Sequence, residues 1–145
     1  MKILVAVDGS PFTKKALKYL ATHLEQLREA PVVHLLHVGL PLPMGMAFSY
    51  QKAVLKSDEV EKYYKDEARK VLSPAEKFLE KKGIVCQSFH ATGQVAQEIQ
   101  EHVKKNKIDF IVMGSHGHGA LAGMVLGSVA TKVLAATVVP VMIVR

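Results

Sequence analysis

The strongest constraint on the fold is the regular alternation of short apolar runs with helical patterns along the chain. The first run, KILVAV, is nearly continuous in apolar residues, which is typical of a strand buried on both faces of a sheet. Strand-sized runs follow at 32–38, 84–90, 109–113 and 140–144. Strands that alternate with helices predict a parallel sheet covered by helices on both faces. The 145 residues fit one domain, 1–145, with a five-stranded α/β sandwich architecture.

The helical segments carry recognisable starts and buried faces. Ser10 suits a helix N-cap and Pro11 the first helical position. The apolar residues that mark one face of this first helix are Leu17, Leu20, Leu24 and Leu27. Two more helices are expected at 92–106, with Ala96, Ile99 and Val103 facing inward, and at 128–137.

A long helical pattern runs from about 57 to 82 and ends at Gly83. It contains SPAE at 73–76, where an interior proline removes a backbone hydrogen bond, so a kink or a new helix start is expected there. The preceding segment, 39–56, is irregular and rich in proline, glycine and methionine. Connections of this length are uncommon, so it is either a lid or binding surface or a packed surface excursion in which the methionines fill gaps.

Composition excludes several classes of protein. No apolar run approaches the length of a bilayer span, and the first one meets Asp8 too early for a signal peptide, so no membrane association is expected. Cys86 is the only cysteine, lies within a strand pattern and is expected to be inert, and we expect a cytoplasmic protein. The net charge of +6 suggests nucleic acid, but there are only three arginines and many lysines fall at helix ends, so no nucleic-acid partner is expected.

The most informative segment is GSHGHGALAGMVLGS, residues 114–128, which follows a predicted strand and contains five glycines and no acid. Glycines let backbone N–H groups approach phosphate oxygens, and Gly127-Ser128 would open a helix whose N-terminus favours anions. VDGS, which ends the first strand, supplies Asp8, a carboxylate able to accept hydrogen bonds from ribose hydroxyls. If these two strands are neighbours, both segments face one crevice at the carboxyl edge of the sheet.

Familiar phosphate-binding motifs fit this segment poorly. The P-loop sequence is absent, and the partial match of 117–122 to the dinucleotide-binding motif lacks the acid expected about 20 residues later. The spacing is different and specific: Gly114, two residues, Gly117, nine residues, then Gly127-Ser128. With ILVAVDGS, LLHV, IVMGSHG and PVMIVR in the same order, it resembles the ATP-binding branch of the universal stress protein family over the whole chain.

The resemblance implies a Rossmann-like fold of the adenine nucleotide alpha hydrolase type, with strand order 3-2-1-4-5. It also implies binding of ATP, with Mg²⁺ or Mn²⁺ accompanying the phosphates, and a homodimer that pairs strand 140–144 across a two-fold axis. By this resemblance Asp8 meets the ribose or adenine, Ala6 lies beside it, and Val38 offers backbone hydrogen bonds to the adenine. The residues expected to wrap the ribose and phosphates, with their neighbours, are Met113, Gly114, Ser115, His116, Gly117, His118, Gly119, Gly127, Ser128 and Val129. His118 and Gly119 stand where many relatives have other residues.

Each of these residues also has a plainer interpretation. The glycine segment could be a loop that merely tolerates glycine, and Asp8 could serve only the turn before Ser10. His116 and His118 could bind a metal with His37, but no third ligand at a fixed spacing supports this, so no metal site is expected. No nucleophile elbow surrounds either serine of the segment, so hydrolase chemistry is disfavoured and no catalytic residue is assigned.

Two classes of function remain from the sequence. The first is a regulatory protein of the stress response that binds adenine nucleotide and acts through a partner. The second is a slow ATPase, in which Lys132 would reach the phosphates, but no carboxylate lies near in sequence to activate water. We favour binding over catalysis; a third alternative, a dimeric adaptor without nucleotide, is disfavoured because the motif is intact.

Overall fold

The computed structural model describes residues 1–24, 30–41, 57–119 and 125–145. The strands in this part of the chain are β1 (Lys2–Ala6), β2 (Val32–Gly39), β3 (Cys86–Thr92), β4 (Phe110–Gly114) and β5 (Val141–Val144). The helices are α1 (Pro11–Leu24), α3 (Ser57–Glu80), α4 (Val95–Asn106) and α5 (Ser128–Ala136). All neighbouring strands pair in parallel in the order β3-β2-β1-β4-β5. The predicted fold class and strand order are confirmed.

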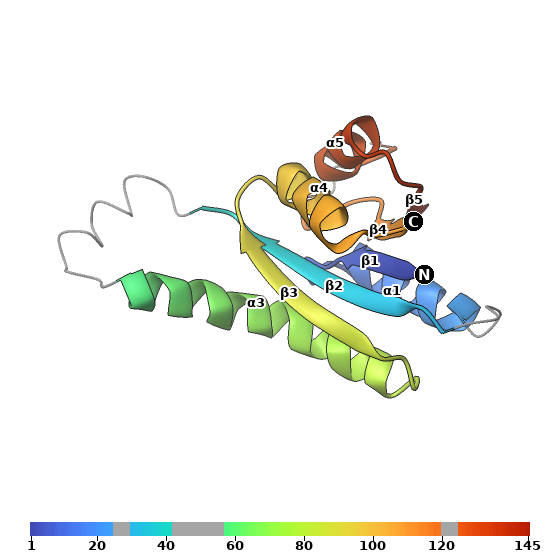
Figure 1. The fold of residues 1–145 in the computed structure, drawn as a ribbon, viewed down its shortest axis with the longest axis horizontal. Coiled ribbons are helices and arrows are strands. Elements are labelled where there is room, and N and C mark those ends of the chain that lie inside the picture. The colour runs from blue at the N-terminus through green and yellow to red at the C-terminus, as the bar shows by residue number, and fades with distance from the viewer. Residues whose placement is uncertain (25–29, 42–56, 120–124) are drawn as a thin grey trace.

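The sheet separates two hydrophobic cores, and Figure 1 shows α4 and α5 on one side of it with α1 and α3 on the other. Alternate residues of β1 supply both cores: Ile3 and Val5 pack with α1 and α3, whereas Leu4 packs with α4 and α5. This alternation is the period-two geometry of a strand covered on both faces.

The predicted start of α1 is confirmed. Ser10 is fully buried, and its Oγ accepts a hydrogen bond from the Thr13 backbone N–H at 3.2 Å, as an N-cap residue does. Pro11 is the first residue of the helix. The Ser10 side chain therefore helps to fix the turn between β1 and α1.

The expected new helix start at Ser73 is wrong, because α3 continues through Pro74 to Glu80. Pro74 is exposed, so the carbonyl group that it leaves unbonded can be hydrated. On the opposite face, Leu72 and Leu79 are buried in the same core on either side of the proline. Continuous packing thus maintains the helix across it.

Strand β3 starts two residues later than predicted, at Cys86, because Ile84 still takes part in the turn that closes the C-terminus of α3 at Glu80. The Ile84 backbone N–H donates to the Leu79 carbonyl at 3.0 Å, and Gly83 adopts a φ of +71°. Burial and the nearby Glu76 and Glu80 raise the pKa of the Cys86 thiol, which disfavours the reactive thiolate.

Leu27 and almost all of the irregular segment, from residue 42 to 56, lie outside the described residues. Within the described helices, none combines the length and apolar character that a membrane crossing requires.

Candidate functional site

The candidate site lies where β1 and β4 end side by side in the centre of the sheet. The chain leaves β1 toward α1 on one face of the sheet and continues from β4 toward α5 on the other face. Such a point, where the direction of the connections reverses, opens a crevice at the carboxyl ends of the strands. A cavity of about 630 Å³ lies there, which is within the range of small-molecule and cofactor sites.

Every residue that the family resemblance assigns to nucleotide binding lines this cavity, whereas Lys132, named for the ATPase alternative, and His37 are not among the described lining residues. From β1, β2 and the turn after β1 come Ala6, Asp8 and Val38. From β4 and the glycine segment come Met113, Gly114, Ser115, His116, Gly117, His118 and Gly119, and from the start of α5 come Gly127, Ser128 and Val129. The fold therefore brings together three segments that are far apart in the sequence.

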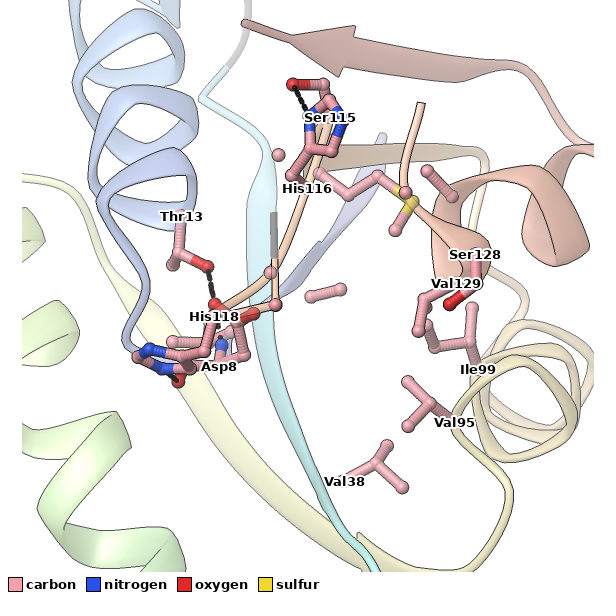
Figure 2. A pocket seen from close by; sticks show the side chains of 18 of the residues that line it. Asp8, Thr13, Val38, Val95, Ile99, Ser115, His116, His118, Ser128 and Val129 are labelled. Atoms are coloured by element: carbon pink, nitrogen blue, oxygen red, sulfur yellow. Dashed lines mark hydrogen bonds between the residues drawn. The ribbon is translucent and has the colours of Figure 1, made fainter. Parts of the chain in front are cut away.

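Seven further residues that no sequence motif indicated line the cavity. The additional lining residues are Val7, Thr13, Leu36, Leu40, Val95, Ile99 and Ala130. Figure 2 shows Val38, Val95 and Ile99 gathered at one end of the cavity, across from Asp8, Thr13 and His118. In sequence, Ile99 looked like any inward position of a helix, and no pattern distinguishes a core residue from a cavity wall. One end of the cavity is therefore apolar and the other polar.

Asp8 serves the turn and still faces the cavity. Its Oδ1 accepts hydrogen bonds from the Ser10 backbone N–H at 2.9 Å and from the Thr13 hydroxyl at 2.5 Å. Its Oδ2 lies toward Gly117, where an added Cβ would be 2.8 Å from that oxygen. The two interpretations of Asp8 are thus compatible, since one carboxylate oxygen fixes the turn while the other points at the glycine segment.

The histidines around the cavity bond to the backbone and to a serine rather than to one another. His118 Nε2 donates to the Asp8 carbonyl at 2.7 Å and ties the glycine segment to the turn after β1. His37 Nδ1 donates to the Val7 carbonyl at 2.8 Å, and His116 Nδ1 lies 3.0 Å from Ser115 Oγ. Across the described ranges, no group of three His, Cys, Asp or Glu side chains could hold a metal ion.

Three of the glycines make close contacts within the protein, and at Gly114 these involve the backbone. A Cβ on Gly114 would lie 2.7 Å from Phe12 Cβ and 2.8 Å from its carbonyl carbon, so α1 packs directly against β4 here. A Cβ on Gly127 would lie 3.2 Å from both the Ser115 carbonyl oxygen and His116 Cα. Together with the contact of Gly117 and Asp8, these close approaches give the glycine spacing a steric reason that needs no ligand. At Gly119, by contrast, an added Cβ meets nothing within 4 Å.

The N-terminus of α5 presents backbone donors to the cavity. The Gly127 N–H donates to the Ser115 carbonyl at 2.8 Å, which anchors the helix to the end of β4. The first bond inside the helix comes from the Thr131 N–H to the Gly127 carbonyl, so the helix itself provides no acceptor for the N–H groups of Ser128, Val129 and Ala130. Such unpaired N–H groups and the helix dipole favour an anion.

The charges around the cavity are consistent with an anionic ligand. From Phe110 to Arg145 the chain contains no Asp or Glu, and Asp8 is the single carboxylate among the described lining residues. The cavity thus combines an apolar end, one carboxylate and a helix N-terminus whose backbone donors favour an anion.

Comparison with known proteins agrees with this geometry. The family model described as the universal stress protein family matches residues 1–145. The chain belongs to the universal stress protein family. A relative named universal stress protein YxiE, from Bacillus subtilis, is 35% identical over 150 residues, which cover 99% of this chain and 98% of that protein.

Solved structures of the family share the fold. The structure of MJ0577, from Methanocaldococcus jannaschii, superposes with a TM-score of 0.82 at 28% identity and covers 99% of this chain and 94% of that one. A universal stress protein family member from Arabidopsis thaliana, solved with AMP bound, has a TM-score of 0.69 at 20% identity and covers 99% of this chain and 90% of that one.

Proposed function

We propose that this universal stress protein binds ATP or another adenine nucleotide in the cavity at the ends of β1 and β4 and acts as a regulatory protein. The observation that carries the proposal is the arrangement of the cavity. Its apolar end, formed by Val38, Val95 and Ile99, suits a purine base, and Asp8 suits a ribose hydroxyl. The N-terminus of α5 lies where the phosphates would follow.

The family comparison supports the ligand class, since a member with the same fold was solved with AMP bound. A divalent cation that accompanies the phosphates would be held mainly by the nucleotide, because the described lining residues include only one carboxylate. That carboxylate already accepts two hydrogen bonds from the turn and α1. In this proposal Asp8 orients the sugar and has no role as a general base.

The residues that line the cavity also favour regulation by nucleotide binding over ATP hydrolysis. Phosphoryl transfer to water needs a group that positions or activates the water, in addition to stabilisation of the phosphate charge. The described lining offers donors for the phosphates at Ser128 and Val129 but no carboxylate other than Asp8. We therefore propose that the bound nucleotide changes how the protein meets a partner in the cytoplasm.

A second copy of the chain is the first partner that we propose. Strand β5 lies at the edge of the sheet, and Val138, just before it, is 92% exposed. Pairing of two β5 strands across a two-fold axis would satisfy the open edge and cover this apolar surface.

The proposed phosphate site is tested by replacing Ser128 with glutamate. Ser128 is exposed at the first position of α5, where a negative side chain is favourable to the helix, so Ser128→Glu retains the fold. The same charge repels a phosphate: at about 5 Å and an effective dielectric constant of 20, Coulomb's law gives about 3 kcal/mol, which solvent screening reduces to about 1–2 kcal/mol. We expect Ser128→Glu to weaken ATP binding about tenfold or more.

The matched control is Ser128→Gln, which has the same size without the charge and is expected to bind ATP within about threefold of the parent protein. Binding is measured by calorimetry, and nucleotide released from freshly purified, denatured protein is identified by mass spectrometry. If the purified protein carries no nucleotide and ATP produces no binding heat, the proposal is wrong and a nucleotide-free adaptor remains. If Ser128→Glu and Ser128→Gln bind ATP with equal affinity, the phosphates do not lie at the N-terminus of α5.

A further inference from the structure

Two histidines meet between β2 and α4, away from the residues that line the cavity. His34, in the middle of β2, is only 3% exposed, and its Nδ1 lies 3.0 Å from Nε2 of His102 on α4. Phe89 of β3 contacts both rings, with centroid distances of 4.7 Å to His34 and 4.7 Å to His102. This cluster of three rings, here called the histidine latch, fastens α4 to the sheet.

The bond between the two rings depends on their protonation. One ring nitrogen must donate its proton while the other offers a lone pair, so the bond cannot form when both rings are cationic. Positive charges also lie near the two rings. Lys2 on β1 disfavours the protonated form of His34, and Lys105 on α4 disfavours the protonated form of His102. A proton added to the latch therefore meets both desolvation and repulsion.

The carboxylates on the neighbouring elements lie against other groups. Glu98 of α4 turns its carboxylate toward Gly93, and Glu101 accepts a hydrogen bond from Gln97 at 3.3 Å. Asp109, just before β4, accepts a hydrogen bond from the Lys2 backbone N–H at 2.7 Å. No acidic side chain contributes to the pKa of either latch histidine in the described structure.

Burial is the main cause of the lowered pKa of both histidines. It lowers the pKa of His34, with Lys2 as a second cause, and it lowers the pKa of His102 to about 4, with His34 and Lys105 as further causes. Both rings are therefore neutral near pH 7, where the latch is closed.

The latch shares its two elements with the apolar end of the cavity. Leu36 and Val38 follow His34 on the same face of β2, and both line the cavity. On α4, Ile99 precedes His102 by three residues, which is one helical turn, and it also lines the cavity. A movement of α4 away from β2 would separate the two sides of the proposed base pocket.

We infer that the histidine latch regulates the nucleotide site by proton uptake: acid opens the contact of α4 with β2 and weakens ligand binding at the apolar end of the cavity. The ligand part of this inference rests on the proposed function. The reverse effect follows by linkage, since a ligand that needs the closed latch must oppose protonation of the pair.

The latch is tested by amide hydrogen exchange of α4 residues 99–106 in the full-length protein at pH 7.5 and pH 5.0. One proton leaves the bond between the rings intact, but it binds more readily in the open form, where His102 is hydrated: a pKa of 6.5 when open and about 4 when closed favours the open form by up to about thirtyfold at pH 5. We expect the protection factor of these amides, corrected for the intrinsic exchange rate, to fall by about tenfold or more in the parent protein.

The double variant His34→Leu/His102→Leu removes both titrating groups and retains an apolar contact, so its protection is expected to change by less than about twofold. His90→Gln, which removes an exposed histidine from β3, is expected to behave as the parent does. If the double variant does not fold, His34→Gln/His102→Gln supplies non-titrating hydrogen-bonding groups at the same two positions. An equal acid-induced fall in the parent and in the non-titrating variant would overturn the latch.

The coupling between the latch and the nucleotide site is tested by repeating the hydrogen exchange at pH 5.0 with saturating ATP. His116 and His118, which line the cavity, are unchanged in every protein compared. We expect ATP to restore the protection of α4 in the parent protein. Calorimetric binding of ATP at pH 5.0 with no gain of protection would disprove the link. Absence of ATP binding at both pH 7.5 and pH 5.0 would disprove the proposed function, while the exchange measured without ligand would still test the latch.

Discussion

The close approach of Gly114 to Phe12 predicts that this glycine serves the fold, whereas Gly119 does not. In Gly114→Ala the new methyl group would lie 2.7 and 2.8 Å from two atoms of Phe12, one of them the backbone carbonyl carbon. In Gly119→Ala it would enter open space. Neither glycine is among the described glycines with positive φ, so both positions accept alanine without backbone strain.

The difference in stability follows from these contacts. Overpacking of a buried contact costs about 1–3 kcal/mol, and a Gly→Ala change at a compatible backbone returns about 0.4–1 kcal/mol through the unfolded state. Gly114→Ala is therefore expected to lose about 1.3 kcal/mol, because the first turn of α1 must shift, and Gly119→Ala to gain about 0.5 kcal/mol. The two variants should differ by about 2 kcal/mol in free energy of unfolding.

Urea denaturation without nucleotide measures this difference. At a slope of about 2 kcal/mol per molar urea, the midpoints of the two variants should lie roughly 1 M apart, with unchanged slopes. Equal midpoints would refute the steric argument. A Gly114→Ala protein of unchanged stability that no longer binds ATP would show that the glycine is needed for the ligand instead.

Two further predictions concern charge. Because the pKa of His102 falls from 6.5 in the unfolded chain to about 4 in the folded one, the unfolded state binds more protons, and stability present above pH 6.5 is lost as the pH falls toward 4. By pH 5 the loss is at most about 2 kcal/mol, and nearer 1 kcal/mol because solvent screens this partly exposed ring; His34→Leu/His102→Leu should lose less between pH 7.5 and pH 5 in urea titrations. Asp8→Asn retains an oxygen for Ser10 and Thr13, so the fold should lose about 1 kcal/mol or less, but it removes the charge offered to the ribose and should weaken ATP binding about tenfold by calorimetry. Unchanged affinity of Asp8→Asn would mean that this carboxylate does not contact the sugar.

The sequence predicted the polar part of the site because that part is built from strand ends and turns. Asp8, Gly117 and Ser128 carry local signals, and a parallel sheet brings the carboxyl ends of its strands to one edge. The order of the strands came from the family resemblance, since periodicity alone does not determine which strands are neighbours. The local motifs of these segments, combined with the strand order of the family, were enough to predict that all the proposed ligand-binding residues surround one cavity.

The apolar part of the site could not be predicted in this way. Val95 and Ile99 have the spacing of core residues, and whether a core position borders a void depends on how a helix sits on the sheet. The contact of His34 with His102 spans 68 residues and has no local pattern. Pro74 misled for a related reason, because the packing of α3 on both sides of it outweighs the missing backbone bond.

The two ends of the cavity are held in physically different ways, and this difference places any regulation at the apolar end. At the polar end, backbone hydrogen bonds join Ser115 to Val144 of β5 and to Gly127 of α5, each at 2.8 Å. At the apolar end, the described attachments of α4 are side-chain packing and the contacts of the His102 ring with His34 and Phe89, and Lys2 Nζ donates to the Asn106 carbonyl at 3.0 Å at the C-terminal end of the helix. Side-chain packing can be loosened by one added proton or one cavity-forming substitution, whereas the backbone hydrogen bonds of the polar end hold the N–H groups of α5 in position. If the proposed function holds, a regulatory signal that changes nucleotide affinity should therefore act on how α4 packs against the sheet, and substitutions there should change affinity without altering the N-terminus of α5.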